Sequence, residues 1–188
     1  VIAFREGRAA EALAWLDEAT RLTPRDPVPH WNRGLVLEAR GRIPEALESL
    51  RASFRLNPRD PKTAYELGKL LVKTGAARDA IPVLEASIRR AARDRAAWEM
   101  LGLALVGADR PQEALVAYGR ARDLGLDSAG LHNNVGIALR VVGRVADARD
   151  AFLEALRREP RHREARLNLQ ILDRGLPRPP RRAGPPRR

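Results

Sequence analysis

The chain has 188 residues, no cysteine and a formal net charge of +11, and only Lys62, Lys69 and Lys73 among its 35 basic residues are lysines. The lack of cysteine excludes disulfides and thiolate chemistry, and no apolar stretch approaches the ~18 residues that a membrane-spanning helix needs. Five arginines follow Gly175 without an acidic residue, so part of the positive charge belongs to the C-terminal segment.

Small residues recur along the chain with a period of 34 residues, without insertion or deletion. An alanine column comprises Ala12, Ala46, Ala80, Ala114 and Ala148. A glycine column comprises Gly34, Gly68, Gly102 and Gly136. A second glycine column comprises Gly7, Gly41, Gly75 and Gly143, with Asp109 in one place. A fixed period of this length predicts a repeat architecture, in which stacked neighbours supply the core that one unit lacks.

The elements are predicted in chain order from the helical spacing of apolar residues in each period. Residues 1–26 form a partial first repeat, and the register places Val1–Arg5 at the close of a helix whose earlier part is missing. We therefore expect the next helix, around Ala12–Ala19, to lack most of its packing partner, and the chain to be a fragment of a longer array or protein. Four full repeats follow, at 27–60, 61–94, 95–128 and 129–162. Their helices are predicted at 28–40, 44–56, 62–73, 78–91, 95–107, 111–123, 129–141 and 145–157.

Two segments of different kinds close the chain. Residues 163–174 are predicted to form a capping helix, because Gln170 and Asp173 occupy columns that hold glycine and leucine elsewhere. Such polar groups make sense there only if no second helix packs over them. Residues 175–188 are rich in proline and arginine, which predicts an extended, disordered tail. This tail is either a solvated linker, an arm for an anionic partner or a proline-rich ligand for another domain.

The third full repeat carries the most complete sequence motif. Its residues Trp98, Leu101, Gly102, Leu105, Ala114 and Tyr118 follow the pattern W-x2-L-G-x2-Y and then A-x3-F. This pattern resembles the tetratricopeptide repeat (TPR) family, and the resemblance covers residues 1–174. It implies an all-α fold, a right-handed superhelical solenoid of antiparallel helix hairpins closed by a capping helix. The small Gly102 and Ala114 are expected where the two helices of a hairpin approach closely.

The register argues against catalytic and metal-binding motifs. His30 and His132 lie three periods apart in the column of Trp98, which predicts packing residues at a helix start. Ser53 and Ser87 occupy a column in which a small residue is required. No Ser–His–Asp set, phosphate-binding glycine loop or acidic cluster with ligand spacing is present, so we predict neither enzymatic activity nor a cofactor or metal.

The resemblance implies that the first helix of each repeat lines a concave groove. The candidate groove residues are Trp31, Asn32, Lys62, Tyr65, Lys69, Lys73, Asn133, Asn134, Arg140 and Asn168. The three lysines fall on one helical stripe, either to bind a ligand carboxylate or as a solvated face that Glu66 partly neutralises.

Asparagines recur in one column of these first helices, at Asn32, Asn134 and Asn168. The column looks like the asparagine ladder of O-linked N-acetylglucosamine transferases, which grips a peptide main chain, although Glu66 and Met100 interrupt it here. Asparagine is also simply frequent at this position of the family, so both interpretations stay open.

The sequence predicts a protein-interaction scaffold that binds a peptide or protein segment, with the lysines favouring an acidic one. The alternative is a substrate-targeting array of a larger enzyme, such as a glycosyltransferase, whose catalytic domain lies outside these residues. Nucleic-acid binding through the basic tail is a weaker hypothesis, because the groove lacks a regular aromatic stacking platform. We further expect a cytoplasmic location, no membrane span, and an open N-terminal repeat that allows oligomerisation.

Overall fold

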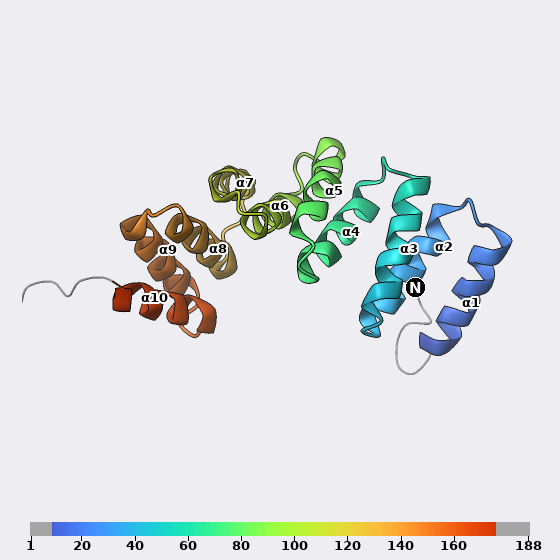
Figure 1. The fold of residues 1–188 in the computed structure, drawn as a ribbon, viewed down its shortest axis with the longest axis horizontal. Coiled ribbons are helices and arrows are strands. Elements are labelled where there is room, and N and C mark those ends of the chain that lie inside the picture. Colours follow the sequence, from blue (N-terminus) through green and yellow to red (C-terminus); the bar gives the residue numbers. More distant parts are fainter. Residues whose placement is uncertain (1–8, 176–188) are drawn as a thin grey trace, which may run out of the picture. The chain divides into compact units, whose positions relative to one another are not determined.

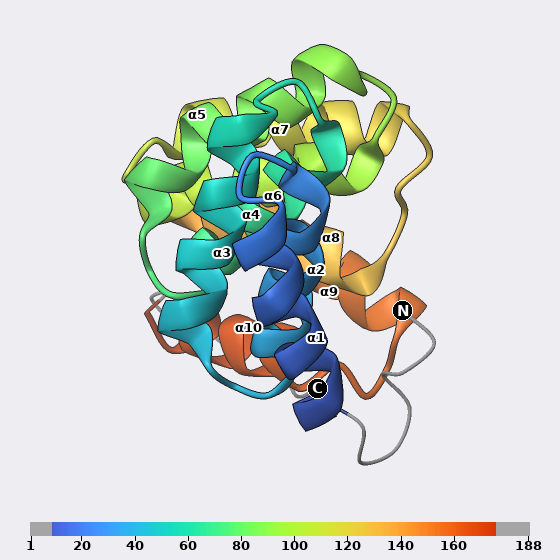
Figure 2. The ribbon, with the colours of Figure 1, turned by 90° about the vertical axis from the view of Figure 1, so that its right-hand side faces the viewer.

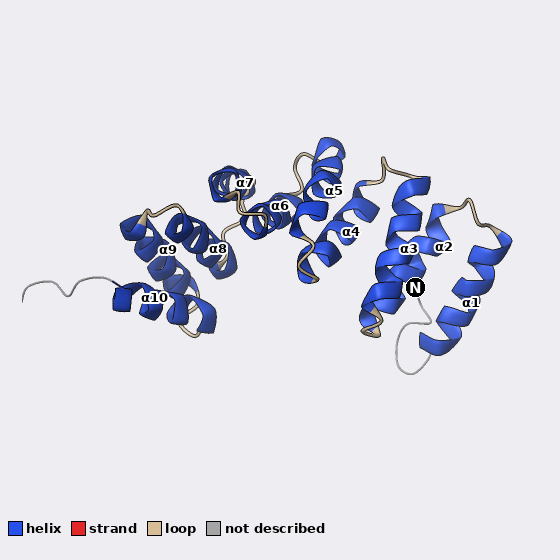
Figure 3. Cartoon of the chain, in the orientation of Figure 1, coloured by secondary structure: helices blue, strands red, loops and turns tan. Residues whose placement is uncertain are grey.

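The computed structural model describes residues 9–175, and all regular structure in that part of the chain is helical (Figures 1 and 3). The helices are α1 (Ala9–Leu22), α2 (Pro27–Ala39), α3 (Ile43–Leu56), α4 (Pro61–Lys73), α5 (Ala77–Arg90), α6 (Arg95–Gly107), α7 (Pro111–Asp123), α8 (Ala129–Val141), α9 (Val145–Arg158) and α10 (Arg163–Gly175). From α2 onward each helix begins and ends within one residue of its predicted bounds, which confirms the predicted helix hairpins. The segment Val1–Arg5 and the tail 176–188 lie outside the described residues.

The helices belong to two compact units, divided between Leu126 and Asp127. In unit 1 (α1–α7), the hairpins α2–α3, α4–α5 and α6–α7 pack against one another in sequence order, and α1 packs on α2 (Figure 2). In unit 2 (α8–α10), α10 packs against the hairpin α8–α9. Small side chains allow this contact, because Ala129, Ala155 and Ala165 form one buried cluster.

The glycine column makes room for a large side chain on the second helix of each hairpin. A Cβ added at Gly102 would lie 2.2 Å from Tyr118 Cε1, and one added at Gly136 would lie 2.5 Å from Phe152 Cε1. Gly34 and Gly68 stand in the same relation to Leu50 and Leu84. The close approach predicted at Gly102 is therefore real, and the nearest atoms across it belong to the ring of Tyr118.

The start of each first helix is marked by a polar residue with the same period of 34. The side chains of Asp26, Asp60, Asp94, Ser128 and His162 accept hydrogen bonds from backbone amides of the following helical turn. These bonds satisfy amides that have no partner within the helix, and each is typically worth ~1 kcal/mol. This capping column is absent from the sequence-based predictions.

Further repeated hydrogen bonds tie the helices to the turns before them. His30 Nε2 lies 3.2 Å from the Pro24 carbonyl oxygen, and two periods later Trp98 Nε1 donates to the Ala92 carbonyl at 2.9 Å. The predicted packing residue His30 therefore also contacts a turn. Ser53 Oγ donates to the Pro27 carbonyl at 2.9 Å, so this buried small residue also connects the two helices of its hairpin.

The turn-glycine column adopts the left-handed backbone conformation. Gly41, Gly75 and Gly143 have φ of 72°, 79° and 81°, and Asp109 replaces glycine in this column with φ of 62°. Aspartate tolerates this region better than most residues, which explains why the substitution does not break the turn. Among the described residues, no helix is long and apolar enough to cross a membrane.

Candidate peptide-binding surface

In unit 1, the first helices of two successive repeats bring two aromatic side chains to one cavity. Trp31 on α2 and Tyr65 on α4 occupy the same column of the repeat. They line a cavity of about 280 Å³ together with Pro61, Lys62, Glu66, Ala91 and Asp94. We call these residues the Trp31–Tyr65 surface. The structure thus brings together three of the predicted groove residues, Trp31, Lys62 and Tyr65.

A second cavity adjoins the first. It measures about 340 Å³ and is lined by Pro27, Val28, Trp31, Ser53, Asn57, Asp60, Lys62 and Thr63. Trp31 and Lys62 line both cavities, so the hollowed surface continues on both sides of these two side chains. Such a concave surface with aromatic walls suits a ligand side chain better than the flat face of a solvated helix.

Carboxylates pair with two of the three lysines. Lys69 Nζ bonds to Glu66 on its own helix and lies 3.7 Å from Glu38 Oε2 on α2, while Lys73 Nζ lies 3.5 Å from Glu38 Oε1. Partial burial disfavours the charged form of Lys69, but the hydrogen bond and the charges of Glu66 and Glu38 outweigh it and raise its pKa. These pairs support the alternative of a partly neutralised helix face. They do not support the other interpretation, in which Lys69 and Lys73 are unpaired and bind a ligand carboxylate.

Glu38 is the residue that sequence reasoning missed at this surface. It lies near the end of α2, in the repeat before the lysines, and its side chain is only 16% exposed. The repeat register could have pointed to Glu38, because it stacks successive first helices side by side and so brings α2 next to the lysines of α4. The prediction nevertheless considered charge pairs only within one helix.

The electrostatic environment of Tyr65 is negative. Partial burial raises the pKa of its phenol, and the neighbouring carboxylate of Glu66 raises it further. Lys69 acts in the opposite direction, but Asp94 and Glu99 add to the effect of Glu66. A phenol surrounded by more negative than positive charge holds its proton more tightly. The excess of carboxylates near this ring therefore makes the electrostatic potential at Tyr65 negative.

The indole nitrogen of Trp31 is buried without a hydrogen-bond partner in the described part of the chain. Trp98 differs, because its nitrogen is satisfied by the turn before its helix. A buried donor without an acceptor costs free energy and is uncommon in folded proteins. Trp31 is therefore held at this surface by the packing of its ring and not by a polar anchor.

In unit 2, the predicted asparagines contact each other. Asn133 is only 6% exposed, and its Oδ1 accepts a hydrogen bond of 2.9 Å from Asn168 Nδ2. This bond joins α8 to α10, so Asn133 is a buried structural residue and its placement in an open groove was wrong. Asn134 is half-buried and Arg140 is exposed on α8, whereas Asn32 is half-buried on α2 in unit 1.

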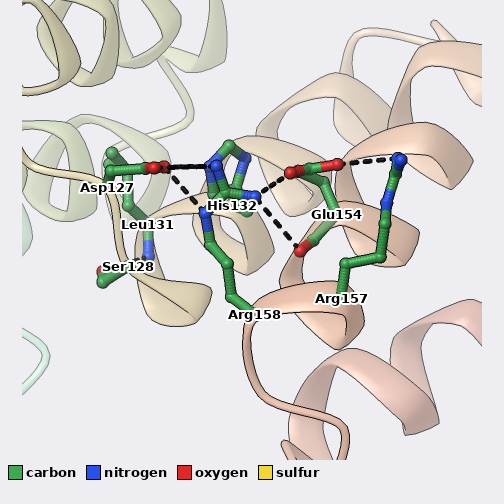
Figure 4. A network of polar contacts seen from close by, with 7 residues as sticks. All are labelled: Asp127, Ser128, Leu131, His132, Glu154, Arg157 and Arg158. Carbon is green, nitrogen blue, oxygen red and sulfur yellow. Dashed lines mark hydrogen bonds and ion pairs between the residues drawn. The ribbon is translucent and has the colours of Figure 1, made fainter.

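A charged network holds the start of α8 to the end of α9 (Figure 4). Arg158 donates to both carboxylate oxygens of Asp127 at 2.8 Å, and His132 Nε2 lies 2.8 Å from Asp127 Oδ1. Glu154 bonds to Arg158 and pairs with Arg157 at 2.7 Å. The bonds from Arg158 and His132 lower the pKa of Asp127 to about 2.

Asp127, Ser128 and His132 are the residue types of a hydrolytic triad, but their geometry serves the fold. Ser128 Oγ accepts the amide of Leu131 at 3.1 Å as the helix cap, while His132 is bonded to Asp127 (Figure 4). A nucleophile would have to donate its proton to the histidine. Among the described residues, no group of three or more His, Cys, Asp or Glu side chains could hold a metal ion.

The comparison with protein families agrees with this architecture. The model of a tetratricopeptide repeat matches residues 65–125 and 136–169, which together are half of the chain. This chain belongs to the tetratricopeptide repeat family. The recurring glycine, alanine and aromatic positions of its hairpins are therefore the TPR positions, as the sequence predicted.

Solved structures with similar folds include several TPR proteins. MamA from Desulfovibrio magneticus RS-1 is 28% identical, with 85% of this chain and 90% of that chain covered and a TM-score of 0.76. YrrB, described as a TPR protein with an unusual peptide-binding site, is 22% identical, with 86% and 84% covered and a TM-score of 0.80. Cut9 of the APC/C hetero-tetramer Cut9–Hcn1 is 21% identical, with 88% and 33% covered and a TM-score of 0.72. At these lower identities YrrB and Cut9 show the shared fold alone. A comparison with curated proteins finds no match.

Proposed function

We propose that this TPR chain is a protein-interaction scaffold that binds a peptide or protein segment at the Trp31–Tyr65 surface. The observation that carries the proposal is the meeting of two cavities at Trp31 and Lys62, with Tyr65 forming a wall of one of them. Half-buried aromatic rings offer a large contact area at a small cost in side-chain entropy, which makes them frequent centres of protein interfaces. YrrB, which shares the fold, is described as having a peptide-binding site.

The other sequence-based hypotheses have less support from the contacts. The acidic ligand is not favoured, because Glu38 and Glu66 already pair with Lys69 and Lys73. The enzyme-targeting array, the cytoplasmic location and oligomerisation through the N-terminal repeat stay predictions. The interaction scaffold is thus the function that rests on described geometry.

A library of random linear peptides displayed against the full chain tests the proposal. Selected peptides are then titrated by fluorescence anisotropy against the parent chain and the variant Tyr65→Ala. We expect the dissociation constant to rise at least about tenfold, the scale of losing an aromatic residue at the centre of an interface.

Val116→Ala is the matched control, because Val116 is an exposed apolar residue on the outer helix α7. It should leave the dissociation constant unchanged, and circular dichroism should show equal helix content for both variants. Selected peptides that bind Tyr65→Ala and the parent chain equally would place the binding surface elsewhere and contradict the proposal.

A further inference from the structure

We propose that the Trp31–Tyr65 surface takes an arginine- and proline-rich segment, and that residues 176–188 of this chain are its occupant. This inference rests on the proposed function and deepens it, because it names the chemistry of the ligand. It also reverses the charge that the sequence alone predicts for the partner.

The first argument is the charge of the cavity walls. Glu66 and Asp94 line one cavity and Asp60 lines the other, whereas Lys62 is the only basic residue lining either of them. Lys69 and Lys73, the other basic side chains of α4, are paired with Glu66 and Glu38. With these pairs counted in full, the carboxylates of Glu38, Asp60, Glu66 and Asp94 outnumber the ammonium groups of Lys62, Lys69 and Lys73 by one, in a chain whose formal net charge is +11. An acidic hollow in so basic a chain selects a cationic ligand.

The second argument is the chemistry of the aromatic walls. A guanidinium group stacks favourably on the faces of tryptophan and tyrosine, and it can also bind a carboxylate through two parallel hydrogen bonds. Proline residues favour an extended conformation with little entropy to lose, and aromatic-lined surfaces recognise such segments. Trp31 and Tyr65 beside Glu66 and Asp94 offer both kinds of contact at one place.

The third argument is the composition of the proposed occupant. Residues 176–188 read LPRPPRRAGPPRR, with five arginines, five prolines and no acidic residue. Arginines elsewhere in the chain often pair with acidic neighbours on the helices, as in Arg42–Glu45 and Arg110–Glu113. The segment 176–188 carries the same cationic groups without any acidic group of its own. Its arginines therefore suit the carboxylates of the cavity walls, and its prolines suit the aromatic rings of Trp31 and Tyr65.

The negative environment of Tyr65 agrees with this match. Glu66, Asp94 and Glu99 all raise the pKa of the phenol, and the single opposing charge is that of Lys69. A guanidinium group placed over the ring would be attracted by each of these carboxylates. A carboxylate ligand would be repelled by them, even though Lys62 lies at the same cavity.

The test is a titration of a labelled synthetic peptide of residues 176–188, followed by fluorescence anisotropy. The receiving protein is the full chain with Arg178, Arg181, Arg182, Arg187 and Arg188 changed to glutamine, so that its own segment does not compete. We expect saturable binding that weakens at least tenfold when the five arginines of the peptide are glutamine. A peptide with its prolines changed to alanine should bind several-fold more weakly. The parent chain should bind the native peptide more weakly than the glutamine variant does.

Two variants in unit 1 locate the binding site. Glu66→Gln removes one lining carboxylate, and Glu85→Gln makes the same charge change at an exposed position on α5. We expect Glu66→Gln to weaken binding several-fold and to reduce its salt dependence, while Glu85→Gln leaves both unchanged. Equal effects of the two changes, or equal binding of the native and glutamine peptides, would overturn the inference.

The outcome also separates this inference from the proposed function. If the peptide of residues 176–188 does not bind, but display-selected peptides of other composition still depend on Tyr65, the scaffold stands and the arginine-rich occupant is wrong. If neither kind of peptide depends on Tyr65, both proposals fall.

Discussion

Gly102 is the residue at which close packing can be tested most directly. A side chain there would have to displace the ring of Tyr118, which is buried and fills the space beside the glycine. We expect Gly102→Leu to lower the free energy of unfolding by roughly 1–3 kcal/mol or more, the usual cost of overpacking a core. Leu103→Ala, which trims a half-buried neighbour, should cost less. Urea unfolding followed by circular dichroism measures both.

A double variant shows whether the ring of Tyr118 causes the loss of stability when a side chain is added at Gly102. In the double variant Gly102→Ala/Tyr118→Ala the added methyl group has no ring to displace, so the two changes should cost less together than the sum of each alone. Strict additivity, or equal melting curves for Gly102→Leu and Leu103→Ala, would refute the assigned packing register.

How far the sequence predicts such contacts depends on whether they recur. The glycine column was visible because its members share one period, yet the partner of Gly102 depends on the angle between two helices, which the pattern does not report. The contact between Glu38 and Lys73 occurs in one place only, so no repetition reveals it. Asn133 shows the limit most clearly, because its amide and its helical position are those of a surface residue, while α10 buries it.

At the scale of the element, helix bounds were predictable because every repeat encodes them again. Pro61 and Pro111 begin their helices, and glycine or Asp109 ends the turn between the helices of a hairpin. The first helix of each repeat also has its own capping side chain, so local sequence and tertiary packing favour the same boundary there. From α2 onward the helices therefore differ from the prediction by no more than one residue at either end. The side-chain network at α8 was not predictable in this way, because Asp127 does not recur at the equivalent position of the other repeats.

That network makes the junction of α8 and α9 sensitive to acid. Arg158 and His132 lower the pKa of Asp127 to about 2, below the ordinary aspartate value of about 4. A carboxylate with a depressed pKa stabilises the fold above its ordinary pKa and loses that contribution as the pH falls toward 2. We expect the parent chain to lose more stability between about pH 4 and pH 2 than Asp127→Asn does, as measured by urea unfolding at each pH.

Asp150→Asn is the matched control, because Asp150 is exposed on α9 and forms no ion pair among the described residues. It should keep the acid sensitivity of the parent chain. If Asp127→Asn and Asp150→Asn gave the same stability profile between pH 4 and pH 2, the network would have no part in the acid response.

For the whole molecule, the repeat pattern predicts stability that varies along the chain. Each hairpin packs on its sequence neighbours, and the helices divide into two compact units between Leu126 and Asp127. A TPR array lacks a single central core, so a packing defect should destabilise mainly the repeats next to it. Gly34 and Gly136 provide equivalent sites for such a defect, one in each unit.

We expect Gly34→Leu and Gly136→Leu to loosen different parts of the chain. The new side chain would meet Leu50 in the first variant and Phe152 in the second. A Cβ alone would lie 2.6 Å from Leu50 Cγ when added at Gly34, and 2.5 Å from Phe152 Cε1 when added at Gly136. Backbone amide hydrogen exchange, followed by mass spectrometry, should therefore speed up in α2–α3 for Gly34→Leu and in α8–α10 for Gly136→Leu. The other unit should keep the exchange rates of the parent chain. A uniform rise across both units would mean that the chain opens as one cooperative body, and the division into units would then have no energetic meaning.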